Sequence, residues 1–412
     1  MSVMRVCVVG SGGREHALAD VLSRTAEVVC APGNPGMAAI AECVGGPPSD
    51  VGADLYVIGP EAPLVEGLAD RLRASGHRVL GPGADGARLE GSKAWMKEVL
   101  VAAGVPTARH GSFSDADGAL RFLKDLPGPW VVKTDGLAAG KGVLVTDNID
   151  AASEDVREKL SGFSFGEAGR TVVIEEGLTG TELSILALCD GHGAVALPAA
   201  QDFKRLGDGD VGPNTGGMGA FSPVPGAGDD VVGEVMERAV LPTLAALRQR
   251  GIDYRGILYA GLMLTADGVR VLEYNVRFGD PETQVVVPRI DDDLAAWLAA
   301  AADGALPVGS PRIAPDAAVT VVMASEGYPA SPHAGATISG IEAAQALPAV
   351  RVYHAGTSLD SDRRLVTAGG RVLAVTGTGP DRAAARAAAY AGVACIDFEG
   401  AQYRADIAGG VG

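Results

Sequence analysis

The sequence predicts an α/β and α+β multidomain protein that begins with a doubly wound parallel sheet. Three observations predict this class. Short apolar runs alternate with helix-like segments through residues 1–91, and a Gly- or Pro-rich break follows each run. The middle of the chain reads as a smaller α+β unit with a long polar segment. Residues 319–412 combine short strands with one Ala-rich helix. In parallel sheets of alternating strands and helices, ligands lie at the carboxyl ends of the strands.

The N-terminal part carries a glycine-rich break, Gly10–Gly13, directly after its first strand. Its N–H groups and the following helix N-terminus suit an anion. The break differs from the dinucleotide fingerprint, because Glu15 stands where the third glycine belongs. The second strand also ends without an acidic residue for a ribose. A phosphate site of another kind and a purely structural turn both stay open. We expect strands at Arg5–Val9, Val28–Cys30, Leu55–Ile58 and Arg78–Leu80, and helices at Arg14–Leu22 and Val65–Ala74.

The remaining elements follow from apolar spacing and from capping residues. Ser92 and Asp381 are expected N-caps, and Gly392 is an expected helix stop. Asp267-Gly268 is a hairpin turn. Helices are expected at Ser92–Ala103, Ser153–Leu160, Glu234–Arg250 and Asp381–Ala391. Strands are expected at Trp130–Lys133, Gly142–Thr146, Thr171–Glu175, Glu182–Leu188, Ile257–Leu264, Val269–Tyr274, Val319–Met323, Val352–His354 and Arg371–Val375.

Composition excludes several classes of protein. The 412 residues carry a formal net charge of −17, which argues against general binding to nucleic acid or to an anionic membrane. Five scattered cysteines without a Cys-x-x-Cys pair argue against a disulfide framework or a structural zinc site. No apolar stretch approaches the roughly 18 residues of a membrane span. We therefore expect a soluble cytoplasmic protein without nucleic-acid or membrane partners.

A glycine-rich hairpin, Gly136–Gly142, carries Lys141 near its end. It is not a Walker A loop, because the spacing is one residue short and Gly142 replaces the Ser or Thr. Such a hairpin can instead close over a triphosphate. Lys133 ends the strand before it and is expected to face an anion. A solvated strand-end lysine stays open as the alternative. The match of residues 162–166 to Gly-x-Ser-x-Gly lies between a helix and a strand, the reverse of a hydrolase elbow.

Two further segments carry most of the chemistry. Gln201–Pro223 is long, polar and glycine-rich, and we expect a functional loop there. Its mixed charges suit a zwitterionic substrate, with a structural role as the alternative. In Glu273-Tyr274-Asn275-Val276-Arg277, strand alternation places Glu273, Asn275 and Arg277 on one face. Two oxygen ligands beside a cation suit Mg²⁺ that bridges phosphates.

These pieces, in this order, resemble the phosphoribosylamine–glycine ligase family of the ATP-grasp superfamily along nearly the whole chain. The matching strings are GSGGREHAL (10–18), APGNPG (31–36), IGPEAPLVEG (58–67), SKAWMK (92–97), VVKTDGLAAGKGV (131–143), QDFKRLGDGDVGPNTGGMGAFSP (201–223), LYAGLML (258–264), LEYNVRFGDPETQ (272–284), YHAGT (353–357), GGRVLAVT (369–376) and YRADI (403–407). The strings at 201–223 and 272–284 are long and highly specific.

The resemblance implies a fold, a reaction and its partners. The fold is a Rossmann-like substrate domain at 1–91, an ATP-grasp domain at 92–318 with a mobile lid at 113–180, and a C-terminal α+β domain at 319–412. The reaction joins glycine to 5-phosphoribosylamine through glycyl phosphate, with ATP and Mg²⁺ (or Mn²⁺), in de novo purine biosynthesis. It yields ADP, phosphate and glycinamide ribonucleotide. A monofunctional enzyme is expected, as a monomer or weak homodimer.

The resemblance also implies residue roles. Around ATP, Lys93 and Lys133 hold phosphates, Lys141 closes over them, Glu175 and Glu176 begin the hinge beside adenine, and Glu182 binds the ribose. Glu273 and Asn275 hold the metal. Arg277 faces the transferring phosphate, and Asp202 receives the glycine ammonium. Gly10, Gly12, Gly13, Asn34 and Glu61 line the phosphoribosylamine site, with Lys204, Arg205 and Asp280 as further substrate contacts.

Two departures and three rivals accompany this interpretation. Phe203 stands where the family usually has His, and Gly261 stands where many ATP-grasp enzymes carry another metal-binding carboxylate. A purine-pathway carboxylase or biotin carboxylase is disfavoured by the 201–223 string. A non-catalytic nucleotide-binding protein is disfavoured by the intact Glu273, Asn275 and Arg277. An NAD-dependent oxidoreductase is disfavoured by Glu15.

Overall fold

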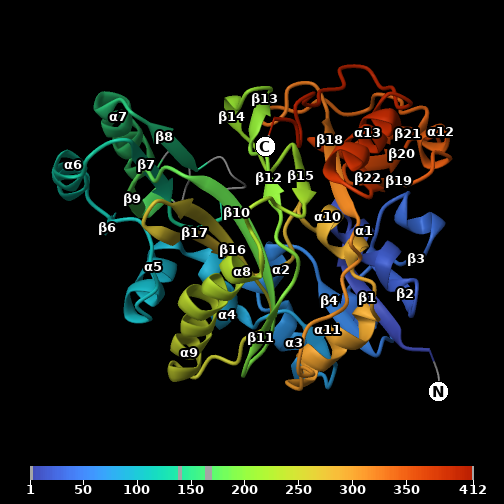
Figure 1. The fold of residues 1–412 in the computed structure, drawn as a ribbon, viewed down its shortest axis with the longest axis horizontal. Coiled ribbons are helices and arrows are strands. Elements are labelled where there is room, and N and C mark those ends of the chain that lie inside the picture. The colour runs from blue at the N-terminus through green and yellow to red at the C-terminus, as the bar shows by residue number, and fades with distance from the viewer. Residues whose placement is uncertain (1–2, 138–141, 163–168, 411–412) are drawn as a thin grey trace.

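The N-terminal sheet is parallel throughout and has the strand order β3-β2-β1-β4-β5 (Figure 1). The computed structural model describes residues 3–137, 142–162 and 169–410. The chain winds outward from β1 in one direction and then in the other, so the order reverses between β1 and β4. Ligand sites of doubly wound sheets lie at such a switch point. The strands are β1 Arg5–Gly10, β2 Glu27–Pro32, β3 Glu42–Cys43, β4 Leu55–Ile58 and β5 Val79–Leu80.

The helices of this part differ from the prediction at one place. The predicted helix Val65–Ala74 is two helices, since Gly67 has a left-handed φ of 76° that interrupts the helical path. The second of them starts only at Leu68. The helices are α1 Gly13–Leu22, α2 Glu61–Val65, α3 Leu68–Ala74 and α4 Ala84–Gly91, with 3₁₀ turns at Met37–Ala39 and Pro48–Asp50.

The central part contains two antiparallel sheets. One sheet has the strand order β11-β10-β16-β17, and the other has the strand order β6-β9-β7-β8. This second sheet and helices α6 and α7 enclose a core of their own, which includes Leu123, Val132, Val156 and Ile174, and they project from the molecule (Figure 1). The elements are α5 Lys93–Ala102, β6 His110–Phe113, α6 Ala116–Asp125, β7 Trp130–Thr134, β8 Val143–Thr146, α7 Ile149–Leu160, β9 Val172–Glu176, β10 Thr181–Asp190, β11 Ala194–Ala196, β16 Arg255–Thr265 and β17 Gly268–Asn275.

The segment Gln201–Pro223 is not the loop that the sequence predicted. It forms β12 Gln201–Asp202, β13 Arg205–Gly207, β14 Val211–Asn214 and β15 Gly219–Ser222. β15 pairs with β18 Ala317–Ala324, so β12 and β15 join a sheet of order β12-β15-β18-β22-β19 with the C-terminal strands, whereas β13 and β14 form a two-stranded sheet of their own. β18 lies about a hundred residues after β15 in the chain, and a local sequence pattern does not encode the pairing of two such distant strands.

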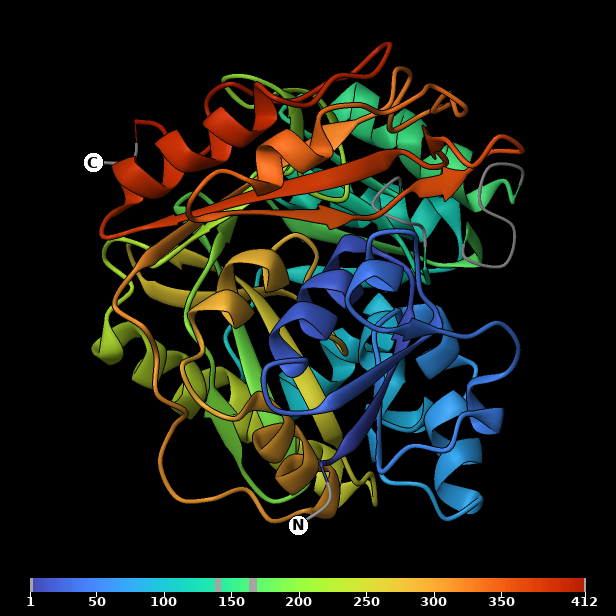
Figure 2. The ribbon, with the colours of Figure 1, turned by 90° about the vertical axis from the view of Figure 1, so that its right-hand side faces the viewer.

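The C-terminal sheet lies between helices. α13 packs on β22 and β18 on one face, as Figure 2 shows, and α10 contacts β15, β18 and β22. Asp381 caps α13 as predicted, by accepting a 2.8 Å hydrogen bond from Ala384 N, but the helix runs through Gly392 to Val393. The elements are α10 Thr283–Val286, α11 Leu294–Asp303, α12 Ile341–Gln345, β19 Val350–His354, β20 Thr357–Leu359, β21 Leu365–Thr367, β22 Arg371–Gly379 and α13 Arg382–Val393.

The predicted helix Glu234–Arg250 is interrupted. α8 Asp229–Val235 passes into a π-helical segment, Met236–Val240, before α9 Leu241–Gln249 continues. Pro242 lacks the N–H for a regular helical bond, and the π segment ends two residues before it. Within residues 3–137, 142–162 and 169–410, no helix combines the length and hydropathy of a membrane span.

Candidate functional site

The N-terminal and central parts meet at Arg277, just past the end of β17. Its guanidinium forms an ion pair with Glu61 at the carboxyl end of β4 (3.4 Å) and another with buried Glu90 of α4 (3.0 Å). It also donates to Asn275 Oδ1 at 3.2 Å. Burial alone would lower the pKa of Arg277, but Glu90 and Glu61 outweigh burial and raise it. The cation is therefore fixed where the switch point of the N-terminal sheet faces β17.

The Gly10–Gly13 loop wraps closely around Glu15. Gly12 N donates to Glu15 Oε2 at 2.7 Å, and a Cβ on Gly10 would lie 2.6 Å from Glu15 Cγ. Gly10 also has a positive φ of 131°. The residue that breaks the dinucleotide fingerprint thus fills the space under the loop and engages one of its N–H groups. A Cβ on Gly13 would lie 2.9 Å from Gln284 Nε2, so the loop also packs against the segment after β17.

Asn34, predicted to line the substrate site, is engaged in hydrogen bonds to the backbone. Its Nδ2 donates to Ser11 O (2.8 Å) and to His354 O (2.9 Å). Its Oδ1 accepts from Gly36 N (3.0 Å) and Met37 N (2.9 Å). The side chain is buried, and it ties the glycine loop to β19. Through these hydrogen bonds Asn34 holds the Gly10–Gly13 loop in place.

Glu175, on β9 of the central part, lies between two lysines. Its Oε1 is 2.7 Å from Lys133 Nζ, and its Oε2 is 2.7 Å from Lys97 Nζ. All three side chains are buried. Burial opposes the charge on Glu175, but Lys133 and then Lys97 lower its pKa to about 2. Burial lowers the pKa of Lys97 to about 8, whereas Glu175 and Glu273 keep that of Lys133 raised against burial. Each carboxylate oxygen of Glu175, which the sequence placed at the hinge beside adenine, therefore forms an ion pair with a lysine.

The other predicted nucleotide contacts lie around the same strands. Glu176 accepts a 2.8 Å hydrogen bond from Arg109 N, at the junction of β9 and β6. Lys93, the first residue of α5, donates to Gly136 O at 3.3 Å and so contacts the base of the glycine hairpin. Lys141 lies outside the described residues.

Lys204 joins the predicted ribose and glycine contacts. Its Nζ is 2.8 Å from Glu182 Oε2 and 2.6 Å from Asp202 Oδ1. Burial would lower the pKa of Lys204, but Asp202 and Glu182 raise it well above its ordinary value. Burial raises the pKa of Asp202, and Lys204 only partly offsets this. One ammonium thus bridges the two predicted subsites.

Glu273 faces a group of cations at the end of β17. Burial opposes its ionisation, yet Lys133, Lys93, Lys204 and Arg277 together lower its pKa. Asn275 follows two residues later on the same face. One carboxylate and one amide oxygen are hard donors, and Mg²⁺ sites often use so few protein ligands because substrate phosphates supply others. The donor set therefore fits a divalent ion held together with phosphates. Among the described residues, no cluster of three or more Asp, Glu, His or Cys side chains forms a self-sufficient metal site.

The remaining predicted contacts are held by the C-terminal part. Asp280 Oδ2 is 3.1 Å from Arg371 Nη2, and its Oδ1 accepts from Gln284 Nε2 at 2.8 Å. Arg371 outweighs burial and lowers the pKa of Asp280. Arg205 donates to Gly212 O at 2.8 Å across the β13–β14 hairpin. Phe203 points elsewhere: its ring packs near Phe221 and lies 4.9 Å from the Arg404 guanidinium carbon.

Comparison with known proteins covers this arrangement from end to end. The sequence patterns of the phosphoribosylglycinamide synthetase N domain, ATP-grasp (A) domain and C domain match residues 4–90, 91–283 and 318–410. The phosphoribosylamine–glycine ligase of Streptomyces coelicolor is 48% identical, over 98% of this chain and 99% of its own. The chain belongs to the phosphoribosylamine–glycine ligase family. The predicted family resemblance and fold class are thereby confirmed.

Solved structures agree with this assignment. A phosphoribosylamine–glycine ligase of Thermotoga maritima has 36% identity and a TM-score of 0.84, over 98% of this chain and all of its own. A biotin carboxylase of Campylobacter jejuni reaches a TM-score of 0.72 at 14% identity, over 98% of this chain and 93% of its own. At that identity the similarity concerns the fold alone. The ATP-grasp fold implies use of ATP and a divalent metal ion.

Several residues that complete the site escaped the sequence analysis. Lys97 lies four positions after Lys93 on a predicted helix, so helical spacing places the two lysines on the same face. That spacing was the signal by which Lys97 could have been found. Glu90, Glu282 and Arg371 fall beside or within the matched strings, but their partners come from other elements of the fold. Only the tertiary structure brings these pairs together.

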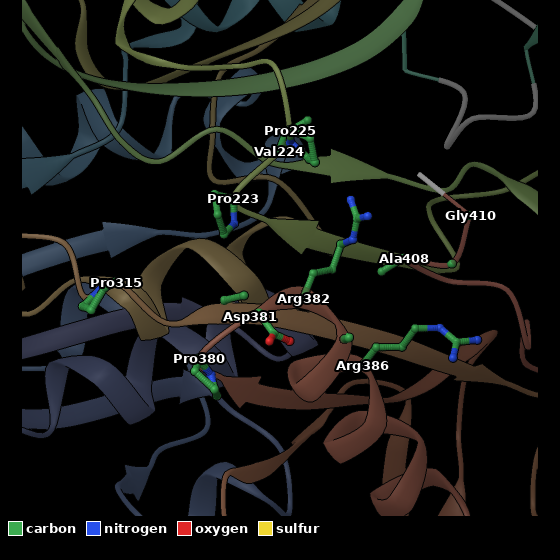
Figure 3. Close-up of a pocket in the computed structure, with 13 residues that line it drawn as sticks. Pro223, Val224, Pro225, Pro315, Pro380, Asp381, Arg382, Arg386, Ala408 and Gly410 are labelled. Atoms are coloured by element: carbon green, nitrogen blue, oxygen red, sulfur yellow. The ribbon is translucent and has the colours of Figure 1, made fainter. Parts of the chain in front are cut away.

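A cavity of about 710 Å³ lies elsewhere in this ligase-family fold. Figure 3 shows it between the start of α13, with Arg382 and Arg386, and the Pro223–Pro225 turn after β15. None of the predicted site residues lines it. The predicted site residues therefore lie away from this cavity.

Proposed function

We propose that this protein joins glycine to 5-phosphoribosylamine through glycyl phosphate, using ATP and releasing ADP, phosphate and glycinamide ribonucleotide. The observation that carries the proposal is the junction at Arg277. There, the end of β17 with Glu273 and Asn275 meets Glu61 at the switch point of the N-terminal sheet. A phosphate-handling strand end thus faces the edge where an anionic sugar phosphate would bind.

We assign the nucleotide to Lys93, Lys133, Lys141, Glu176 and Glu182. Lys133 is pre-oriented by Glu175, so its ammonium needs little reorganisation to meet a phosphate. Glu182 is neutralised by Lys204 in the substrate-free protein, and a nucleotide ribose would take over part of that contact. Glu175 itself is proposed to position Lys133.

Glu273 and Asn275 would hold the divalent ion, which we take to be Mg²⁺ or Mn²⁺. When bound, such an ion neutralises charge on the phosphates and aligns them for displacement. Arg277 would contact the phosphoryl group during transfer and the acyl phosphate afterwards. Its two carboxylate partners hold the guanidinium in one orientation. Both chemical steps then depend on positioning and charge and require no nucleophilic side chain.

The two remaining substrates are assigned to either side of Arg277. Asp202 is proposed to receive the glycine ammonium. Gly10, Gly12, Gly13 and Glu61 are proposed to line the phosphoribosylamine site, with Lys204, Arg205 and Asp280 as neighbouring contacts and Asn34 as the residue that fixes the loop. Functional units at 1–91, 92–318 and 319–412, with a lid at 113–180, a cytoplasmic location and a monomer or weak homodimer complete the proposal.

The test is the nucleotide product and its dependence on both co-substrates. Purified protein with Mg-ATP, glycine and 5-phosphoribosylamine should release ADP and phosphate, because an acyl-phosphate route transfers only the γ-phosphoryl group. Omission of glycine should abolish release. Chromatography of the spent nucleotide decides the route, and AMP with pyrophosphate as the main products would refute it.

A further inference from the structure

Arg404, near the end of the chain, is a buried cation to which the proposed reaction gives no role. Only 1% of its surface is exposed. Its Nε and Nη2 donate to the two carboxylate oxygens of Asp406 at 2.7 and 2.6 Å, and its Nη1 donates to Asp210 Oδ1 at 2.6 Å. A buried guanidinium adds little net stability, because it has been removed from water. Its bidentate pairing does fix its orientation, which favours a role that depends on geometry.

The segment around Arg404 lies against the turn of the β13–β14 hairpin. Ala405 N donates to Asp208 Oδ1 at 2.7 Å, and Gly209 N donates to Asp406 Oδ2 at 2.8 Å. The hairpin lies close to the C-terminal end of the chain in Figure 1. Hydrogen bonds in both directions thus join the C-terminal segment to the hairpin turn.

Arg404 also holds the chain on both sides of Lys204. Its guanidinium carbon lies 4.9 Å from the centre of the Phe203 ring, and its Nη1 donates to Arg205 O at 3.2 Å. Thr215 donates to the carbonyl oxygen of Lys204 itself, through its N and its Oγ1, both at 2.8 Å. Three consecutive residues are therefore fixed by contacts that lie outside the proposed substrate site.

The ammonium of Lys204 lies between a proposed nucleotide contact and a proposed glycine contact. Its Nζ is 2.8 Å from Glu182 Oε2 and 2.6 Å from Asp202 Oδ1. A lysine has a flexible four-carbon stem, so the place of its ammonium depends on where its main chain is held. A misplacement of about 1 Å by a distant change can be costly for binding and catalysis. The position of the hairpin therefore affects both subsites at once.

We infer that Arg404 is a positioning residue which, through Phe203 and Arg205, holds Lys204 where it meets the contacts for the ATP ribose and for glycine. This inference rests on the proposed function, and it gives the C-terminal part of the chain a share in substrate binding. Phe203 departs from the family pattern, and in this chain it supplies the aromatic face on which the guanidinium lies. Arg404 acts on binding only through these neighbours.

Arg404→Lys keeps the charge but loses the bidentate pair with Asp406. We expect the KM values for ATP and glycine to rise together, each about fivefold or more, as loss of a charge-assisted hydrogen bond typically produces. The kcat and the KM for 5-phosphoribosylamine should stay within about twofold of wild type. Hydrogen exchange at residues 203–205 should be faster in the variant. A purely structural role would lower the melting temperature and leave both KM values unchanged, and that result overturns the inference.

Arg289→Lys is the matched control. Arg289 is also a buried arginine, and it donates to Ser222 Oγ at 2.6 Å, at the other end of the 201–223 segment. Its replacement should lower the melting temperature and keep the KM values for ATP and glycine within about twofold of wild type. Equal rises in the two variants would mean general loosening of the fold and would overturn the inference. Wild-type ADP formation is measured first. Its absence would sink the proposed function, whereas unchanged KM values in an active Arg404→Lys enzyme would sink only this inference.

Phe203→Leu keeps the inference testable should Arg404→Lys fold poorly. Leucine keeps an apolar side chain beside Phe221 but removes the aromatic face from the guanidinium. The KM values for ATP and glycine should again rise together, about threefold, as loss of a cation–π contact typically produces. Unchanged KM values in a folded Phe203→Leu variant would overturn the inference.

Discussion

Glu273 is a carboxylate whose ionised form is stabilised by neighbouring cations. Burial disfavours its ionised form, but Lys133, Lys93, Lys204 and Arg277 surround it and lower its pKa. A group whose folded-state pKa is lowered contributes stability above its ordinary pKa and loses it as the pH falls. In the absence of ligands the carboxylate therefore offsets repulsion among these cations.

Glu273→Gln should consequently reduce both turnover and, modestly, stability at neutral pH. The amide retains one oxygen donor but removes the anion, so a divalent ion would bind more weakly and the phosphoryl group would lose alignment. We expect turnover to fall on the order of 100-fold, the typical effect of losing one preorganised electrostatic group. Rates across a magnesium titration and melting curves test this. Glu326→Gln, at a side chain 62% exposed and outside the site, is the control. Near-normal turnover of Glu273→Gln at low magnesium would exclude Glu273 as a ligand.

At this same scale, the sequence predicted residue chemistry better than residue partners. Strand alternation correctly put Glu273 and Asn275 at one strand end, because that period is local. The prediction for Glu175 was made without its partners, Lys97 from α5 and Lys133 from β7, and their approach depends on how helix and sheet pack. Asn34 likewise has the amide expected of a binding residue, but four backbone groups engage it.

Among elements, the start of α5 is joined to the segment that follows β7. Ser92 caps α5 as predicted, with a 3.1 Å hydrogen bond from Trp95 N. Asp135, at the end of β7, adds bonds that the sequence did not predict: its carboxylate accepts from Ser92 Oγ and Ala94 N, both at 3.1 Å. The base of the hairpin is therefore fastened to the start of α5, next to Lys93.

Asp135→Ala should loosen this fastening and weaken nucleotide binding. Losing a helix-capping side chain costs about 0.5–2 kcal/mol, which corresponds to a rise of roughly twofold to thirtyfold in the KM for ATP if the whole cost falls on nucleotide binding. Asp135→Asn retains one oxygen acceptor and should lie between alanine and wild type. Hydrogen exchange at residues 93–96 should speed up in the alanine variant. An unchanged KM for ATP, with faster exchange there, would separate the cap from nucleotide binding.

The sequence predicted strands that have an apolar pattern, but it did not predict strands that depend on pairing with a distant part of the chain. β10, β16 and β17 were found from their apolar patterns, and the Asp267-Gly268 turn fixed one hairpin. The short strands β12–β15 have no such pattern, because Gly and charged residues fill Gln201–Pro223. β15 pairs with β18, far along the chain, and β12 pairs with β15, whereas β13 and β14 pair with each other.

Across the whole molecule, a pair of buried histidines joins the first and last parts of the chain. His354 N, on β19, donates to His16 Nδ1, on α1, at 2.8 Å, and both rings are buried. The two rings also meet the turn that holds Asn34, since a Cβ on Gly36 would overlap them. Burial lowers the pKa of His16 to about 3, with a further contribution from His354, and burial lowers the pKa of His354 to about 4. Both histidines are therefore neutral in this interface, which packs against the turn at Asn34 and Gly36.

The association of these two parts should therefore weaken as the pH falls below about 6.5, the ordinary pKa of a histidine in an unfolded chain. Below that pH the histidines bind protons in the unfolded state but not in the folded state. Each histidine therefore lowers the free energy of unfolding by up to about 1.4 kcal/mol per pH unit until its folded-state pKa is reached. Glu282, whose pKa is raised, takes up a proton in the folded state and acts in the opposite direction between pH 7 and its ordinary value near 4.5.

The histidine contribution is isolated by comparing wild type with His16→Asn, which retains an acceptor for His354 N. Melting temperatures from pH 7.5 to 5.5 should fall more steeply for wild type than for the variant. Hydrogen exchange at residues 33–37 and 352–357 should accelerate at pH 5.5 in wild type before it does elsewhere. Parallel melting curves for the two proteins over this range would mean that the histidine pair does not set the pH response of the interface.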